Sequence, residues 1–106
     1  MLGKKNRLTK RGSFSYVYRS GERRDGKVLK LLYVKSGGLR IGFSVGAKLG
    51  KAHVRNLLKR RLRASARELM PNITKGWQMV FVAKHGAEET GYEELRREMG
   101  WLLRGL

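Results

Sequence analysis

The segment from Lys51 to Leu69 constrains the fold most, because it predicts a long helix with two unlike faces. At about 100° per residue, one face carries an apolar stripe made of Val54, Leu58, Leu62, Ser65, Ala66 and Leu69. The opposite face carries Arg55, Asn56, Lys59, Arg60, Arg63 and Arg67. Met70-Pro71 ends the helix, since the residue before a proline avoids the helical conformation. We expect the first face to pack on a core and the second to present cations.

The next clear element is a strand over residues 39–46. Its apolar residues Leu39, Ile41, Phe43 and Val45 alternate with Arg40, Gly42, Ser44 and Gly46. One face of this strand is therefore apolar and the other is nearly bare. Two interpretations remain open: the bare face lets a large ligand approach the backbone, or it admits a packed helix.

The other elements are shorter. We expect a helix with Ser13 as its N-cap and Gly21 just past its end, then a loop over residues 22–27. Strands are expected over residues 28–34 and 77–83, and a capping box over residues 90–93 opens a final helix. The residues alone give the order α-β-β-α-β-α, an α+β sandwich in a single domain over residues 1–106, with residues 1–12 as a basic arm.

The charge of the chain points to its partner. The net charge is +17, and residues 1–67 carry 20 basic residues against two acidic ones, whereas residues 68–106 carry five against six. Eight basic residues and no acidic one lie between Lys48 and Arg67. Such a surface repels itself unless a polyanion is near, so we expect a nucleic acid partner. The alternative is a solvated charged face, which the absence of acids in this run disfavours.

Few residues suit catalysis by the protein. There is no cysteine, the only aspartate is Asp25, and the two histidines, His53 and His85, are far apart. The acids between Glu88 and Glu98 follow a solvent-facing helical pattern rather than that of a metal site. No apolar run is long enough for a membrane span or signal peptide, so we expect a soluble, cytoplasmic protein with no stable protein partner.

Two groups of residues resemble the bacterial ribonuclease P protein subunit family. The first comprises Ser44-Val45, Lys48-Leu49-Gly50-Lys51-Ala52, Arg55-Asn56, Lys59-Arg60 and Arg63. The second resembles the opening segment of that family and comprises Arg7-Leu8, Lys10, Phe14, Val17, Tyr18 and Gly21. The similarity runs from about Arg7 to Leu103.

The resemblance implies a two-layer α+β sandwich of order α-β-β-β-α-β-α, ribosomal-protein-like, with a left-handed β-α-β crossover against the usual rule. The fourth strand would come from splitting residues 27–46. It also implies that the chain assists a catalytic RNA, ribonuclease P RNA, which removes the 5′ leader of precursor tRNA. Mg²⁺, bound mainly by that RNA, would support the hydrolysis, and the protein would hold no catalytic residue and no metal.

The same resemblance assigns binding residues. Those expected to meet the catalytic RNA are Lys48, Lys51, Arg55, Asn56, Lys59, Arg60, Arg61 and Arg63. Those expected to form a leader-binding cleft, with Gly42 nearby, are Arg7, Lys10, Phe14, Tyr18, Tyr33 and Ser44.

One position departs from the family, which usually has Arg-Asn-Arg where this chain has Arg55, Asn56 and Leu57. We hypothesise that Arg61, one turn later on the same flank, partly replaces the missing guanidinium.

Two other classes of function compete with this interpretation. A structural ribosomal or RNA-chaperone protein would be equally basic. A membrane-surface amphipathic helix ranks last, because residues 51–69 have no aromatic anchor.

Overall fold

A computed structural model describes residues 6–8 and 11–106. The principal elements in chain order are α1 (Arg11–Ser20), β1 (Glu22–Asp25), β2 (Leu29–Lys35), β3 (Arg40–Ser44), α2 (Ala52–Leu69), β4 (Trp77–Ala83) and α3 (Tyr92–Leu102). Short 3-10 turns follow β3, α2 and β4, at Ala47–Leu49, Met70–Asn72 and Ala87–Glu89. The α-β-β-β-α-β-α order implied by the resemblance is confirmed.

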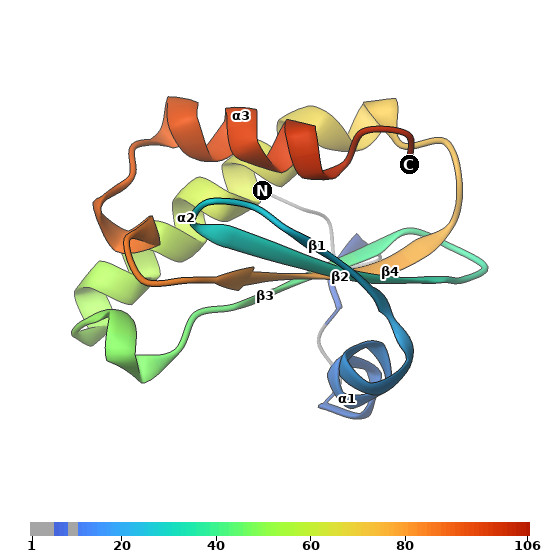
Figure 1. Cartoon of the computed structure of the whole chain (residues 1–106), viewed down its shortest axis with the longest axis horizontal. Helices are drawn as coiled ribbons and strands as arrows, with labels where there is room; N and C mark the ends of the chain where they lie inside the picture. Colours follow the sequence, from blue (N-terminus) through green and yellow to red (C-terminus); the bar gives the residue numbers. More distant parts are fainter. Residues whose placement is uncertain (1–5, 9–10) are drawn as a thin grey trace.

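The four strands form one mixed sheet in the order β1-β2-β4-β3. β1, β2 and β4 are antiparallel neighbours, whereas β3 runs parallel to β4. The connection from β3 through α2 to β4 is thus a β-α-β crossover. That this crossover is left-handed stays a prediction. Helices α2 and α3 cover one face of the sheet, and α1 lies against the other (Figure 1). The α+β sandwich is confirmed, and in addition α1 covers part of the second face of the sheet.

The fourth strand is not where we expected it. Residues 22–27 were predicted to be a loop, but Glu22–Asp25 form β1, which pairs with Lys30–Tyr33 of β2. Residues 27–46 hold only β2 and β3. The prediction was wrong because β1 is an edge strand of four charged residues, held by backbone hydrogen bonds and lacking the apolar alternation that identifies a strand.

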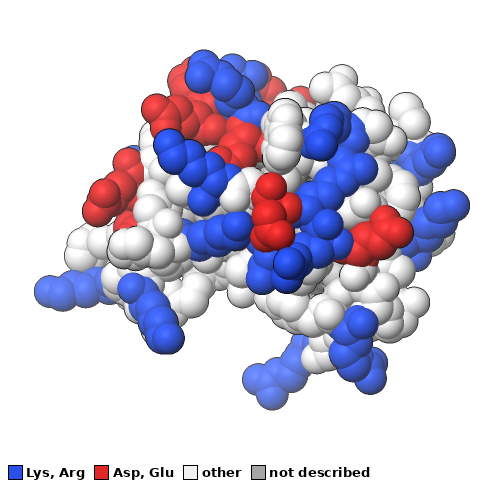
Figure 2. All heavy atoms as spheres, in the orientation of Figure 1, with Lys and Arg blue, Asp and Glu red and all other residues white. Residues whose placement is uncertain are grey.

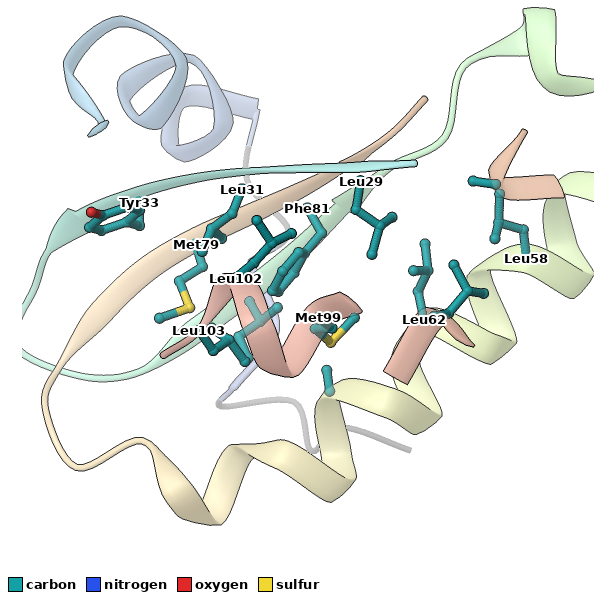
Figure 3. Packing of buried hydrophobic residues seen from close by; sticks show 14 of the residues in the cluster. Leu29, Leu31, Tyr33, Leu58, Leu62, Met79, Phe81, Met99, Leu102 and Leu103 are labelled. Carbon is teal, nitrogen blue, oxygen red and sulfur yellow. The ribbon is translucent and has the colours of Figure 1, made fainter. Parts of the chain in front are cut away.

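The main core lies between the sheet and the pair α2 and α3 (Figure 3). Alternate residues of the strands point into it, as do the apolar stripes of both helices; its fully buried members include Leu29, Leu31, Ile41, Leu58, Leu62, Met79, Phe81, Leu95, Met99 and Leu102. The apolar face predicted for β3 is confirmed, and so is the apolar stripe predicted for α2 from Leu58 to Leu69; Val54 is half-buried and lies outside this core. No helix in the described part of the chain is long and apolar enough to cross a membrane.

A smaller apolar cluster lies under α1, on the opposite face of the sheet. It comprises Leu8, Val17, Leu32 and Val80, with Phe14 packed beside them. A Cβ atom on Gly42 would lie 2.6 Å from Cζ of Phe14. At Gly42, therefore, the bare face of β3 is bare because a helix packs on it, which is the second of the two interpretations left open above.

The ends of two helices differ from the prediction. Ser13 lies inside α1, which begins at Arg11, so it is not the N-cap. The N-cap of α3 is Gly91, and the Thr90 hydroxyl donates to the Gly86 carbonyl (2.8 Å) instead of capping the helix. Before α3 the chain forms the 3-10 turn Ala87–Glu89, which engages the Thr90 hydroxyl, and a local capping pattern does not show this.

The described part of the basic arm is attached to the sheet. Arg7 forms a parallel bridge with Ile41, and the Leu8 N–H donates to the Ile41 carbonyl (3.0 Å). The Asn6 amide donates to the Leu39 carbonyl (2.9 Å). Residues 6–8 thus run along the outer edge of β3.

Candidate nucleic-acid interface

The outward face of α2 carries cations that the protein does not neutralise. Arg55, Lys59 and Arg63 form a row at successive turns, and Asn56, Arg60 and Arg67 beside it are exposed. Among the described residues, no Lys or Arg between positions 48 and 67 takes part in an ion pair. Such a row attracts the phosphates of a nucleic acid.

Contacts at the start of α2 extend this basic row. The Arg55 Nε donates to the Gly50 carbonyl (3.1 Å), which fixes the guanidinium beside the chain entering the helix. Lys48 lies in the 3-10 turn after β3, and Lys51 occupies the N-cap position of α2; both are exposed. The predicted contact residues on α2 and before it therefore form one surface, apart from Arg61.

Arg61 lies on a different flank. Its Nη1 donates to the Thr90 carbonyl (3.1 Å), so this flank of α2 faces the start of α3. Lys59, two residues earlier, is about 200° away around the helix, on the flank away from α3. Leu57, on the flank of Arg61, is 46% exposed. The hypothesis that Arg61 replaces the missing guanidinium stays a prediction, and one of its donors is already used within the protein.

The acidic residues gather elsewhere. Figure 2 shows acidic side chains grouped over the start of α3, mixed there with basic ones. Arg96 pairs with Glu68 (3.8 Å) and Glu93 (3.3 Å), and the Tyr92 hydroxyl donates to the Glu68 carboxylate, which raises the pKa of Tyr92. In the described part of the chain, no three His, Asp or Glu side chains are grouped so that they could hold a metal ion.

The prediction that Glu98 faces solvent is wrong. Its Oε2 accepts hydrogen bonds from the backbone N–H groups of Val28 (2.9 Å) and Leu29 (2.6 Å). Glu98 is half-buried and holds the turn between β1 and β2 against α3.

A second surface lies beside α1, which covers only part of its sheet face. The register places Leu32, Val80 and Gly42 in one row across β2, β4 and β3, and this row is buried. The next row, formed by Lys30, Val82 and Ser44, is half-buried. We call this second row the open strip.

Two aromatic residues of α1 border the open strip. Ser13 and Ser20 line hollows at the opposite end of the strands, beside Gln78 and Val34, so their flank of α1 faces away from the strip. Phe14 and Tyr18 share the other flank, one turn apart. Tyr18 is 46% exposed, and Phe14 is half-buried against Gly42. Phe14 and Tyr18 therefore lie on the flank of α1 that faces the strip, and Ser44 lies in the strip; their joint role as a leader-binding cleft stays a prediction.

Charged residues lie at the β1 end of the open strip. Asp25, beside Lys30, pairs with Arg23 (3.2 Å) and with Lys84 (3.2 Å). The hydrogen bond from Lys84, together with the charges of Arg23 and Lys30, holds the pKa of the Asp25 carboxyl below its usual value. At the β3 end, Ser44 leads through residues 45–47 to Lys48. The strip and the basic row are thus joined by a few residues of chain.

Tyr33 does not belong to this cleft. It points to the opposite face of the sheet, is 7% exposed, and meets Trp77 edge to face with ring centroids 5.4 Å apart. Arg24 covers its ring at 5.2 Å. The signal was present in the sequence, because Tyr33 shares its parity in β2 with the buried Leu29 and Leu31. Lys30, which sequence reasoning missed, has the opposite parity and therefore lies on the face of the open strip.

The remaining predicted cleft residues lie apart from the strip or outside the description. Arg7 lies along β3, beside Ile41, and its Nε is buried with no hydrogen-bond partner among the described residues. Lys10 lies outside the described residues. Val82, which forms the middle of the strip, was not singled out from the sequence.

Comparison with known proteins shows the family of the chain. A family model described as Ribonuclease P matches residues 2–106. The chain is 40% identical over 105 residues to a "Ribonuclease P protein component" of Microcystis aeruginosa, covering 92% of this chain and 88% of that protein. It is 39% identical over 101 residues to a "Ribonuclease P protein component" of Bacillus mycoides, with the same coverage of 92% and 88%.

Solved structures agree. The RNase P protein from Thermotoga maritima superposes with a TM-score of 0.85 at 28% identity, covering 94% of this chain and 96% of that one. A Staphylococcus aureus RNase P protein superposes with a TM-score of 0.85 at 22% identity and 93% coverage of both chains, a likeness of fold alone. The chain therefore belongs to the family of ribonuclease P protein components, which are subunits of an endoribonuclease that processes tRNA.

Proposed function

We propose that this chain binds the RNA of ribonuclease P through the outward face of α2, and the 5′ leader of precursor tRNA through the open strip beside α1. The observation that carries the proposal is the junction of the two surfaces. The strip ends at Ser44, and the chain then passes through Lys48 and Lys51 into the basic row of α2. A substrate held in the strip would thus lie close to an RNA held by α2.

The contribution of the protein is electrostatic and positional. Two RNA molecules repel each other, and the uncompensated cations of α2 reduce that repulsion. The strip offers a cationic head at Lys30 and a hydroxyl at Ser44, and α1 adds the exposed ring of Tyr18. Single-stranded RNA uses such features, because its bases stack on aromatic rings while its phosphates contact cations. In this proposal Mg²⁺ is bound mainly by the RNA, which performs the hydrolysis.

The salt dependence of binding tests the electrostatic part. If six to eight phosphates are contacted, log K falls with log salt at a slope of about −4 to −7. We expect Lys59→Ala to make that slope shallower by about one, because one phosphate contact is lost. Lys75→Ala, at an exposed lysine outside both surfaces, should leave the slope unchanged. A nearly flat dependence for the unaltered chain would contradict the mechanism.

The decisive experiment is reconstitution. The purified chain is added to a bacterial ribonuclease P RNA and precursor tRNA at low Mg²⁺, and 5′ leader removal is measured. We expect the chain to increase cleavage. Lys30→Ala and Tyr18→Ala should weaken substrate affinity, while mature tRNA, which has no leader, should bind both variants like the unaltered protein. No gain in leader removal would favour the alternative, a structural or RNA-chaperone role.

A further inference from the structure

A hollow lies beside the flank of α1 that carries Ser13, away from the open strip, and it has no role in the proposed function. It has a volume of about 390 Å³ and lies at the end of the sheet opposite to the open strip. Its lining residues are Leu8, Ser13, Ser36, Gly37, Gly38, Arg40 and Gln78. We call it the Arg40 hollow.

The polar side chains of the Arg40 hollow have no partners within the described protein. Arg40 forms no ion pair there, and neither the Ser13 hydroxyl nor the Gln78 amide forms a hydrogen bond with any described residue. No acidic residue lines the hollow. By contrast, the hollow beside Trp101 is lined by three carboxylates and two cations: Asp25, Glu94, Glu98, Lys27 and Arg97.

The backbone of the Arg40 hollow is also accessible. A Cβ atom on Gly37 or on Gly38 would meet no atom within 4 Å, so both glycines border open space. The turn that holds them is fixed from behind, because the Ser36 N–H donates to the Gly76 carbonyl (3.1 Å). A fixed turn with unpartnered polar groups suits a ligand that carries both hydrogen-bonding groups and negative charge.

The Arg40 hollow and the open strip lie on the same face of the sheet, at opposite ends of β3. Arg40 and Ser44 are the two ends of β3 and point to the same face of the sheet, about 13 Å apart at 3.3 Å per residue. Exposed tyrosines stand on both flanks of α1: Tyr18 on the side of the strip and Tyr16 on the side of Ser13. A single strand of RNA that enters the open strip at Ser44, beside the basic row, and then passes over α1 would reach Arg40.

The geometry points to a second subsite for single-stranded RNA in the Arg40 hollow, which takes leader nucleotides farther from the cleavage site than those in the open strip. This inference rests on the proposed function, since the strip must hold the nearer nucleotides. Arg40 contacts a phosphate, Gln78 and Ser13 hydrogen-bond a base or sugar, and Tyr16 supplies a stacking surface.

Leader length provides the first test. Binding of precursor tRNAs with stepwise longer leaders is measured with reconstituted holoenzyme. The double variant Arg40→Ala/Gln78→Ala should bind short-leader substrates normally and long-leader substrates about five- to tenfold more weakly. Lys75→Ala should bind both normally. Equal affinity of the double variant and the unaltered protein at every length would overturn the subsite.

Site-specific crosslinking provides the second test, and the chain suits it because it has no cysteine. Gly37→Cys places a thiol in open space at the hollow, and Ser44→Cys places one in the strip; each is coupled to a photoreactive group in the holoenzyme. Gly91→Cys, which is also in open space but at the start of α3, is the matched control.

We expect Gly37→Cys to label leader nucleotides farther from the cleavage site than Ser44→Cys labels, and Gly91→Cys to label none. Suppose that Ser44→Cys labels the leader but Gly37→Cys labels the catalytic RNA or no RNA. That result would overturn the second subsite and leave the proposed function intact. Absence of leader labelling from Ser44→Cys would overturn the proposed function with it.

Discussion

The two faces of the sheet are built from the same strands, yet they are covered very differently. Two helices, α2 and α3, close one face over a continuous core, whereas α1 alone covers only part of the other (Figure 1). Neighbouring residues of one strand therefore serve different ends: Phe81 is fully buried and Val82 lies in the open strip. Stability comes mainly from the first face, which leaves side chains on the second face available for binding.

We expect the largest effect, a loss of unfolding free energy, when Phe81 rather than its neighbour Val82 is changed. Phe81→Ala should lower the free energy of unfolding by about 3–5 kcal/mol, because it removes a fully buried ring from the main core. Val82→Ala, at a half-buried position, should cost about 1 kcal/mol or less and should weaken leader binding instead. Denaturant unfolding and leader affinity are measured for both; equal destabilisation would show that the faces do not divide these roles.

The second effect concerns the contact that holds α1 against the sheet. Gly42→Ala would place a methyl group 2.6 Å from Cζ of Phe14 and 3.1 Å from Cβ of Leu8, so the ring must move. We expect a loss of about 1–3 kcal/mol in unfolding free energy, with weaker leader binding because Phe14 borders the strip.

Gly46→Ala is the matched control, because its Cβ would meet nothing within 4 Å. If both variants behave like the unaltered protein in unfolding and leader binding, the close packing of α1 on β3 is refuted.

The third effect tests Arg61 against Arg67, which is exposed on the outward face of α2. Arg61→Ala should lower the unfolding free energy by about 1 kcal/mol, because the hydrogen bond to the Thr90 carbonyl is lost. Arg67→Ala should leave it nearly unchanged. If Arg61 also replaces the guanidinium missing at Leu57, Arg61→Ala should weaken RNA affinity more than Arg67→Ala does. An equal or smaller loss of affinity would disprove that hypothesis.

The smallest effect is a pH dependence at the end of the open strip. The pKa of Asp25 is lowered in the folded protein, so its ionised form stabilises the fold. That contribution is fully present above the ordinary value of 3.8 and is lost as the pH falls through the lower, folded pKa. Thermal melts in this acid range should show a slightly weaker pH dependence for Asp25→Asn. An unchanged profile would mean that the pairs with Arg23 and Lys84 add nothing to stability.

Periodicity predicted the core face of the molecule well. The apolar stripe of α2 and the alternation of β3 identify buried residues directly, because burial against a continuous core requires a regular spacing. The alternation of β2 could also have placed Tyr33 in the core. We put it in the cleft on the strength of the family resemblance, and this was wrong.

The open face was harder to predict for physical reasons. Which row of the sheet stays uncovered depends on where α1 crosses it, and that is set by contacts such as Phe14 on Gly42 between distant parts of the chain. β1 was missed because its pairing uses backbone groups, which every residue carries. Lys30 and Val82 gave no signal of their own, since an isolated lysine or valine in a strand is ordinary.

The docking of residues 6–8 along β3 has a consequence for the protein at high concentration. An unpaired strand edge offers a row of backbone donors and acceptors on which another chain can add a strand and begin to aggregate. Here the arm occupies part of the β3 edge through the Arg7–Ile41 bridge and the Leu8 hydrogen bond. At the other edge, β1 is short and consists only of charged residues, which resist such addition. Both margins of the sheet are thus protected against self-association, one by its own chain and the other by charge.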